Sequence, residues 1–152
     1  MNAKTDIGAW RAVLLAQSRT LRAIERDLEA AGAMSLSWYD VLLELNGAPG
    51  RKLRMQDLAA RAVVSRPRVS RIVSELESAG FLERRADPAD GRAWFVTITS
   101  AGRDMLRSTA PLYLDGIERH FNRHISAEDR RRVEALLTPV VDAHQADLDL
   151  RR

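Results

Sequence analysis

Residues 55–85, MQDLAARAVVSRPRVSRIVSELESAGFLERR, hold two helical patterns separated by a short turn. The first pattern covers residues 56–62, and residues 63–64 form the turn that follows it. The second covers residues 65–79, begins at a serine suited to helix capping, and tolerates a proline in its first turn. Gly80 is placed to end it. A short helix, a tight turn and a second amphipathic helix predict a helix-turn-helix.

Apolar side chains in the second helix recur at the spacing of a single face, which Val69, Ile72, Val73 and Leu76 occupy. This face must point into the core. Ordinary surface helices mix both charge signs on the remaining side, whereas no carboxylate stands here before Glu75. Arginine and serine donors in the first turns favour the major groove of DNA over a merely solvated surface. The predicted DNA-binding residues of this helix are Ser65, Arg66, Pro67, Arg68, Ser70 and Arg71.

A predicted hairpin follows, with strands over residues 82–86 and 93–99 and the turn sequence DPADG between them. A hairpin beside a recognition helix can lie along the DNA backbone, and an arginine near its tip can enter the minor groove. Asp90 is placed to pair with the guanidinium of Arg92 and hold it extended. The alternative is a solvent-exposed hairpin with incidental charges. The predicted DNA-binding residues of this wing are Arg84, Arg85, Asp90 and Arg92.

Positive charge is concentrated in this central part of the chain. Residues 51–92 contain ten basic and six acidic side chains, and nine of the ten are arginine. Residues 1–50 contain five basic and six acidic side chains, and residues 93–152 contain nine of each. A local excess of arginine is the electrostatic signature of a polyanionic partner, although alone it also fits a solvated surface.

Long helical patterns flank the central unit, one over residues 5–31 and one over residues 99–124. Ser37 is placed to cap a further helix that precedes the helix-turn-helix. Within the later pattern, Pro111 predicts a kink or break near Ala110.

The last helix is predicted to open at the capping sequence of residues 126–129 and to run through Val141. The terminal helices carry more apolar surface than one lobe can cover. A homodimer formed by the chain ends would bury this surface, and a twofold axis is the commonest arrangement. The apolar residues concerned are Ile7, Trp10, Leu14, Leu112, Leu114, Ile117, Leu136, Leu137 and Val140.

The predicted fold class is therefore mainly α (α+β), a winged helix-turn-helix with N- and C-terminal dimerisation helices. Three regions follow from this organisation. Residues 1–35 form the N-terminal dimerisation helix, residues 36–99 the DNA-binding lobe, and residues 100–152 the C-terminal dimerisation helices.

The stretch from LAARAVVSRPRVSRIV through AGFLERR and DPADGRA to ITSAG resembles the MarR (multiple-antibiotic-resistance regulator) family. The resemblance implies an obligate homodimer that places two recognition helices in successive major grooves of a palindromic operator, usually as a repressor. It places residues 65–71 on the family's groove-reading stretch, and Asp90 and Arg92 on its wing pair.

Members of this family typically respond to small, often aromatic anions that bind between the dimer helices and the winged lobe. The resemblance therefore implies a possible small-molecule effector. The residues expected to line its pocket are Trp10, Trp38, Tyr39 and Asp40, with core or interface packing as the alternative for each.

Other classes find little support in the sequence. The chain has no cysteine, and His120 and His124, although spaced to share a helix face, lack an evident third metal ligand. No phosphate loop, nucleophile elbow or catalytic triad pattern is present, so we expect neither an enzyme nor a cofactor. No apolar run suggests a signal peptide or membrane span, so the expected location is cytoplasmic. A ligand-independent architectural DNA-binding protein of the same fold is the alternative function.

Overall fold

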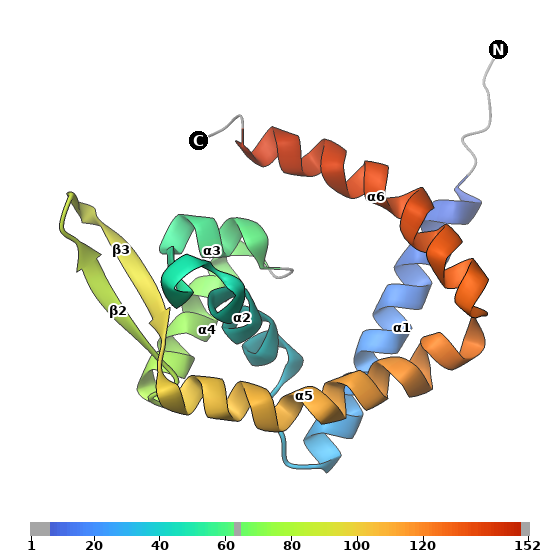
Figure 1. The fold of residues 1–152 in the computed structure, drawn as a ribbon, viewed down its shortest axis with the longest axis horizontal. Coiled ribbons are helices and arrows are strands. Elements are labelled where there is room, and N and C mark those ends of the chain that lie inside the picture. Colours follow the sequence, from blue (N-terminus) through green and yellow to red (C-terminus); the bar gives the residue numbers. More distant parts are fainter. Residues whose placement is uncertain (1–6, 63–64, 150–152) are drawn as a thin grey trace.

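The computed structural model describes residues 7–62 and 65–149, with side chains described up to residue 144. The turn predicted at residues 63–64 lies outside these ranges. The described chain is mainly helical with one small antiparallel sheet, which confirms the predicted fold class (Figure 1). Its elements, with η for 3₁₀ turns, are α1 (Gly8–Ala30), α2 (Leu36–Gly47), η1 (Pro49–Arg51), β1 (Lys52–Arg54), α3 (Met55–Arg61), α4 (Arg66–Ser78), β2 (Leu82–Asp87), β3 (Asp90–Ile98), α5 (Ser100–His120), η2 (Asn122–His124) and α6 (Ala127–Asp149).

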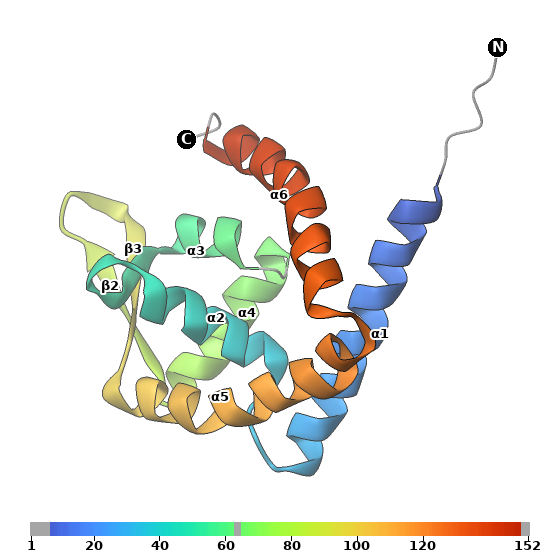
Figure 2. The ribbon, with the colours of Figure 1, turned by 45° about the vertical axis from the view of Figure 1, so that its right-hand side comes forward.

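The elements form a lobe and an arm. Helices α2, α3 and α4 gather with the hairpin into the lobe (Figure 1). Helix α5 leads from the lobe to the arm, which consists of α1, the C-terminal part of α5 and α6. Helix α1 lies against α5, and α6 extends beyond this contact (Figure 2). The two terminal helices are thus carried outside the lobe that contains the helix-turn-helix.

The lobe core is built on the apolar face predicted for the second helix of the motif. Val69, Ile72, Val73 and Leu76 of α4 are all buried, as their spacing required. They belong to a single buried cluster with side chains of α2, α3, the sheet and α5. Its fully buried members from those other elements include Val41, Leu42, Leu45, Leu58, Leu82 and Val96.

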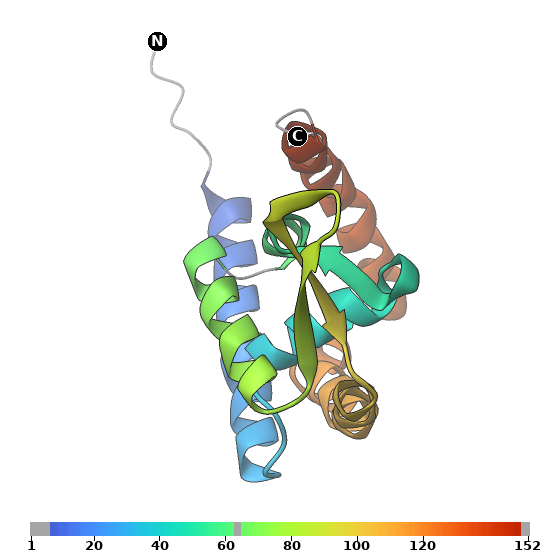
Figure 3. The same ribbon diagram turned by 90° about the vertical axis from the view of Figure 1, so that its left-hand side faces the viewer.

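The sheet has the strand order β1-β3-β2, and both pairings are antiparallel. Figure 3 looks at the β2–β3 hairpin from its own side, with α4 beside it. The turn is shorter than predicted, because Asp87 pairs with Asp90 and leaves only two residues between the strands. The Asp87 carboxylate accepts the Ala89 backbone N–H at 2.9 Å and so closes this tight turn. Strand β3 therefore begins three residues earlier than residue 93.

Helix α2 starts two residues before the expected position. Its N-cap is Ser35, whose hydroxyl accepts the Trp38 backbone N–H at 3.3 Å, so the prediction of Ser37 as the cap is wrong. The Ser37 hydroxyl instead lies 3.2 Å from that of Ser35. Helix α1 ends before Gly32, which has a φ of +65° as a helix-terminating glycine requires.

Helix α5 continues through Pro111, so no break separates it into two helices. The proline is exposed, and buried neighbours on the same helix, Leu106 and Thr109, anchor that stretch to the rest of the chain. The helix ends at His120, four residues before the predicted end, because Phe121 has a φ of −132°.

The capping pattern before the last helix is confirmed. The Ser126 hydroxyl accepts the Asp129 backbone N–H at 3.1 Å and bonds the Asp129 carboxylate at 2.7 Å. The helix that follows extends to Asp149, well past the predicted end at Val141, and it includes Pro139.

A close backbone contact joins the start of α5 to the end of α4. The Thr99 hydroxyl accepts the Gly102 N–H at 3.1 Å and donates to the Gly80 carbonyl at 2.8 Å. The Thr99 N–H in turn donates to the Phe81 carbonyl at 3.1 Å. Gly102 is buried against this Phe81 carbonyl, so a side chain there would overlap backbone. The ITSAG sequence thus fixes α5 to the lobe.

We expect Gly102→Ala to lower the free energy of unfolding by about 1–3 kcal/mol, because its methyl group would overlap the Phe81 backbone. Gly47→Ala in the last turn of α2 is the matched control, since nothing lies within 4 Å of the added Cβ. The control should leave stability unchanged or raise it, as alanine is the better helix former. Urea denaturation at one protein concentration measures both, and equal stability of the two variants would contradict the close contact.

Candidate nucleic-acid interface

The first turns of α4 present the predicted face to solvent. Ser65, Arg66, Pro67, Arg68, Ser70 and Arg71 are all exposed. Pro67 stands in the first turn, where its missing N–H costs no helical hydrogen bond. Ser65 occupies the N-cap position as predicted, but its side chain makes no capping hydrogen bond. Its hydroxyl is therefore not committed to the α4 backbone.

Arg71 is oriented by a carboxylate on the same helix. Its Nε donates to Glu75 Oε1 at 3.1 Å, while its side chain stays 83% exposed. Glu75 Oε2 accepts the indole N–H of Trp38 at 3.1 Å, which joins α4 to α2. These contacts lower the pKa of Glu75, the Trp38 hydrogen bond having the larger effect. The carboxylate therefore stays charged and holds Arg71 along the helix.

Arg84 lies at the base of the wing and binds α4. Its Nε donates to Glu77 Oε2 at 2.8 Å, and a second nitrogen lies 2.5 Å from the same oxygen. This hydrogen bonding lowers the pKa of Glu77. Half-buried and paired, Arg84 fastens the hairpin to the recognition helix, a contact that sequence analysis did not anticipate. Arg85 is exposed and pairs with Glu83 at 3.0 Å.

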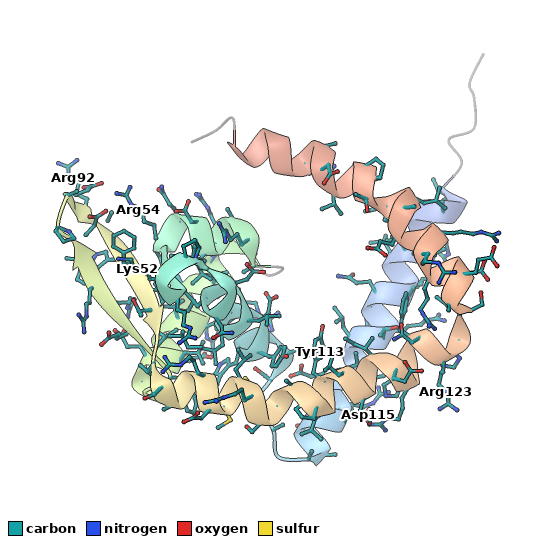
Figure 4. All side chains as sticks on the ribbon, viewed as in Figure 1. Lys52, Arg54, Arg92, Tyr113, Asp115 and Arg123 are labelled. Carbon is teal, nitrogen blue, oxygen red and sulfur yellow. The ribbon has the colours of Figure 1, made fainter. Side chains whose placement is uncertain are left out.

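Arg92 stands exposed at the tip of the wing (Figure 4). The pairing expected between its guanidinium and Asp90 is wrong in detail. The Asp90 carboxylate accepts the backbone N–H of Arg92 at 3.1 Å, because the short turn brings this amide over the carboxylate. Asp90 thus shapes the tip and leaves the guanidinium extended into solvent.

Asp87 and Arg54 form a brace for the wing that sequence analysis missed. The Asp87 side chain is only 4% exposed and lies 2.5 Å from Arg54 Nη2. Arg54, on β1, also packs over the Phe95 ring at 5.7 Å. The Asp-Pro pair was interpreted only as a turn signal, whereas an acidic residue at a hairpin end also needs a cation when it is buried.

A hollow of about 440 Å³ lies between the wing, the start of α3 and the first turns of α4. Arg54 and Arg92 mark two of its walls in Figure 4. It brings predicted residues of the recognition helix and of the wing together on one surface. Its lining is Arg54, Met55, Gln56, Ala59, Arg66, Ser70, Asp90, Arg92, Ala93 and Trp94.

A second cleft, also of about 440 Å³, separates the arm from the lobe. Two predicted pocket residues, Tyr39 and Asp40, line it, together with Tyr113 of α5, which sequence analysis missed. The Tyr39 and Tyr113 rings lie 4.8 Å apart, and burial raises the pKa of both phenols. The remaining lining residues are Leu21, Arg22, Glu25, Leu36, Ser37, Leu43 and Arg68.

The other two predicted pocket residues lie elsewhere. Trp38 points toward α4, where it bonds Glu75 and meets the Phe81 ring edge-on at 6.1 Å. Trp10 is 63% exposed on the first turn of α1. Neighbouring positions on a helix point in different directions, so Trp38 turns away from the cleft that Tyr39 lines.

The two histidines do not share a helix face, because α5 ends at His120 and His124 belongs to η2. His120 is partnered rather than solvated, since its Nε2 lies 2.6 Å from Asp27 Oδ2, and this bond lowers the pKa of Asp27. The described side chains, those of residues 7–62 and 65–144, include no cluster of three suited to a metal ion. Nor does any helix in these ranges have the length and hydropathy needed to cross a membrane.

The helix pair, the exposed face of α4 and the braced hairpin define a winged helix-turn-helix protein. The sequence profile of the MarR family matches residues 34–93, which run from before α2 into β3. Solved structures of MarR-family regulators match nearly the whole chain. In sequence over residues 34–93, and in fold over nearly its whole length, the chain is similar to the MarR family of transcriptional regulators.

Two of these structures are from Streptomyces coelicolor. The regulator AbsC matches with a TM-score of 0.80 and 27% identity, over 96% of this chain and 98% of AbsC. Sco3205, solved in complex with DNA, matches with a TM-score of 0.79 and 29% identity, over 89% of this chain and 84% of Sco3205. The transcriptional repressor MprA of Escherichia coli K12 is 28% identical over 95 residues, which are 62% of this chain and 53% of MprA. The match thus spans about half of MprA.

Proposed function

We propose that this protein is a homodimeric, sequence-specific DNA-binding repressor. The observation that carries the proposal is the exposed face of α4, which offers Arg66, Arg68 and Arg71 with no carboxylate before Glu75. Bidentate guanidinium groups on an accessible helix are suited to reading guanine edges in the major groove. The wing supplies Arg92 to the neighbouring minor groove. The DNA complex of the related Sco3205 supports this reading.

The uncovered apolar surface of the arm supports the proposed dimerisation through the arm. No described side chain of α6 is buried, although this helix carries several large apolar residues. Contiguous exposed apolar surface of this kind marks a protein–protein interface, and closed twofold assembly is the commonest outcome. Of the residues predicted for this interface, Ile117 is half-buried and the others are exposed, and Val141 of α6 is exposed as well.

Light scattering at micromolar concentration should give about twice the 17.0 kDa mass of one chain. Leu136→Glu, which places a charge on the exposed apolar face of α6, should shift the mass toward that of a monomer. Ser108→Glu, on the exposed surface of α5, is the matched control and should remain dimeric. A stable monomer for the parent protein would overturn the dimer.

Recognition helix and wing should contribute to DNA binding in different ways. On a duplex selected from a random library, Arg68→Ala and Arg71→Ala should each weaken binding by about 1–3 kcal/mol and relax base preference at one or two positions. Arg92→Ala should weaken binding to all duplexes of equal A·T content alike, and reduce the slope of log affinity against log salt by about one unit.

The matched control is Arg107→Ala, which removes an exposed arginine of α5 that pairs with Asp104. It should bind like the parent protein. Fluorescence anisotropy over a range of salt concentrations measures the four variants and the parent protein. Parent-like binding by both α4 variants would show that this helix does not read bases, and an unchanged Arg92 variant would remove the wing from the interface.

An architectural DNA-binding protein of the same fold would bind specific and scrambled duplexes with similar affinity. A repressor must find its operator among many other sites, so its specific affinity should be higher by about a thousandfold or more. Support for repression comes from the relative MprA, whose name describes a transcriptional repressor. A protein bound across a promoter represses transcription by occupying that site.

A small aromatic carboxylate bound in the cleft between arm and lobe is the proposed inducer. The cleft volume of about 440 Å³ lies within the usual range for small-molecule sites, and tyrosine and leucine side chains form its apolar walls. Arg68 belongs both to the lining of this cleft and to the DNA-reading face of α4. An anion that binds the Arg68 guanidinium therefore withdraws it from DNA.

Benzoate at millimolar concentration should bind the protein and weaken its affinity for the selected duplex, as calorimetry and anisotropy would measure. Leu43→Trp, which fills the cleft from α2, should abolish this response while DNA binding without benzoate persists. Ser108→Trp, outside the cleft on α5, should respond as the parent does. Binding of benzoate with no effect on DNA affinity would contradict the proposed release.

A further inference from the structure

Trp94 is a large, half-exposed aromatic residue on the side of the wing that faces the hollow. It is 49% exposed, and it lines the hollow between the wing, α3 and α4. Among the described residues, neither its ring nor its indole N–H has a partner. Exposed tryptophan of this kind is typical of a contact surface, since one end of the side chain is apolar and the other is a hydrogen-bond donor.

Strand geometry fixes the direction in which Trp94 points. Side chains alternate across a strand, so Arg92, Trp94 and Val96 of β3 lie on the same face. Val96 is fully buried in the lobe core, which means that this face looks toward the helices. Trp94 therefore lies between the buried base of the wing and Arg92 at its tip, on the side of α4.

The hollow around Trp94 is positively charged. Arg66 of α4 and Arg92 of the wing line it without an ion pair among the described residues, whereas Arg54 of β1 is paired with Asp87. The carboxylate in the lining is that of Asp90. Asp90 is already engaged with the backbone N–H of Arg92. The two guanidinium groups without an ion pair, beside an apolar floor, suit a ligand in which anionic groups are joined by apolar rings. A sugar–phosphate chain is such a ligand.

We propose that this hollow binds one sugar–phosphate strand of duplex DNA, with Trp94 packed on a deoxyribose and the arginines on its flanking phosphates. The proposal rests on the proposed function. When α4 occupies a major groove and the wing tip the adjacent minor groove, the strand that separates the two grooves must cross between them. The hollow lies at this crossing, because it is bounded by α4 on one side and by the wing on the other.

This contact has a thermodynamic signature distinct from that of the arginines. Covering the exposed half of an indole ring removes apolar surface from water but releases no counterions. Loss of Trp94 should therefore weaken DNA binding without changing its salt dependence. Because deoxyribose is the same in every nucleotide, the loss should be equal for selected and random-sequence duplexes.

The test uses a random-sequence duplex at low salt, with binding followed by anisotropy. Trp94→Ala should raise Kd about tenfold at an unchanged salt slope, and Trp94→Phe, which keeps a ring, should recover most of this loss. Val13→Ala, which removes an exposed apolar residue of α1 outside the hollow, is the matched control and should bind like the parent. Far-ultraviolet circular dichroism confirms that each variant is folded.

A second readout does not depend on any truncation of Trp94. In the Trp10→Phe/Trp38→Phe protein, Trp94 is the remaining tryptophan, and its emission should shift when the random-sequence duplex is added. Parent-like affinity of Trp94→Ala, or unchanged emission of Trp94 on a duplex that the protein binds, would overturn the strand contact alone. Failure of the parent protein to bind any duplex would instead overturn the proposed function, and the strand contact with it.

Discussion

The burial of one face of α4 is the constraint on which the rest of the molecule depends. Val69, Ile72 and Val73 are buried, and exposing them would be unfavourable. Burial of each large apolar side chain stabilises the folded state by about 1.5–3 kcal/mol. Once this face is fixed against the lobe core, the rotation of the helix about its axis is fixed as well. Arg68 and Arg71 are then outside, whatever the remaining chain does. The same packing that stabilises the lobe thus determines which side chains are available to DNA.

The base of the wing packs into the lobe core through Leu82 and Val96, and ion pairs add to this contact with the lobe. A two-stranded hairpin is only marginally stable alone, so it needs contacts with the rest of the lobe. Arg84 binds Glu77 of α4 at its base, and Asp87 binds Arg54 of β1 near its tip. The two contacts set the position of the wing relative to the recognition helix, and with it the hollow between them.

Sequence alone predicted features that depend on local periodicity. The faces of α4, the hairpin and the exposed Arg92 belong to this group, because a few neighbouring residues determine them. Features that depend on distant partners were not predictable in the same way. Trp38 was expected in the ligand cleft but bonds Glu75, which lies 37 residues further along the chain. Arg84 was predicted to contact DNA, whereas the structure pairs it with Glu77 of α4. This contact depends on how the strand packs against that helix.

In the proposed dimer, the two copies of α4 should read two half-sites at once. Selection of DNA by the 152-residue protein from a random duplex library, followed by sequencing, is the decisive measurement. We expect an inverted repeat whose half-site centres lie about 10 base pairs, one helical turn, apart. Enrichment of a single unrepeated half-site, or of no sequence at all, would contradict it.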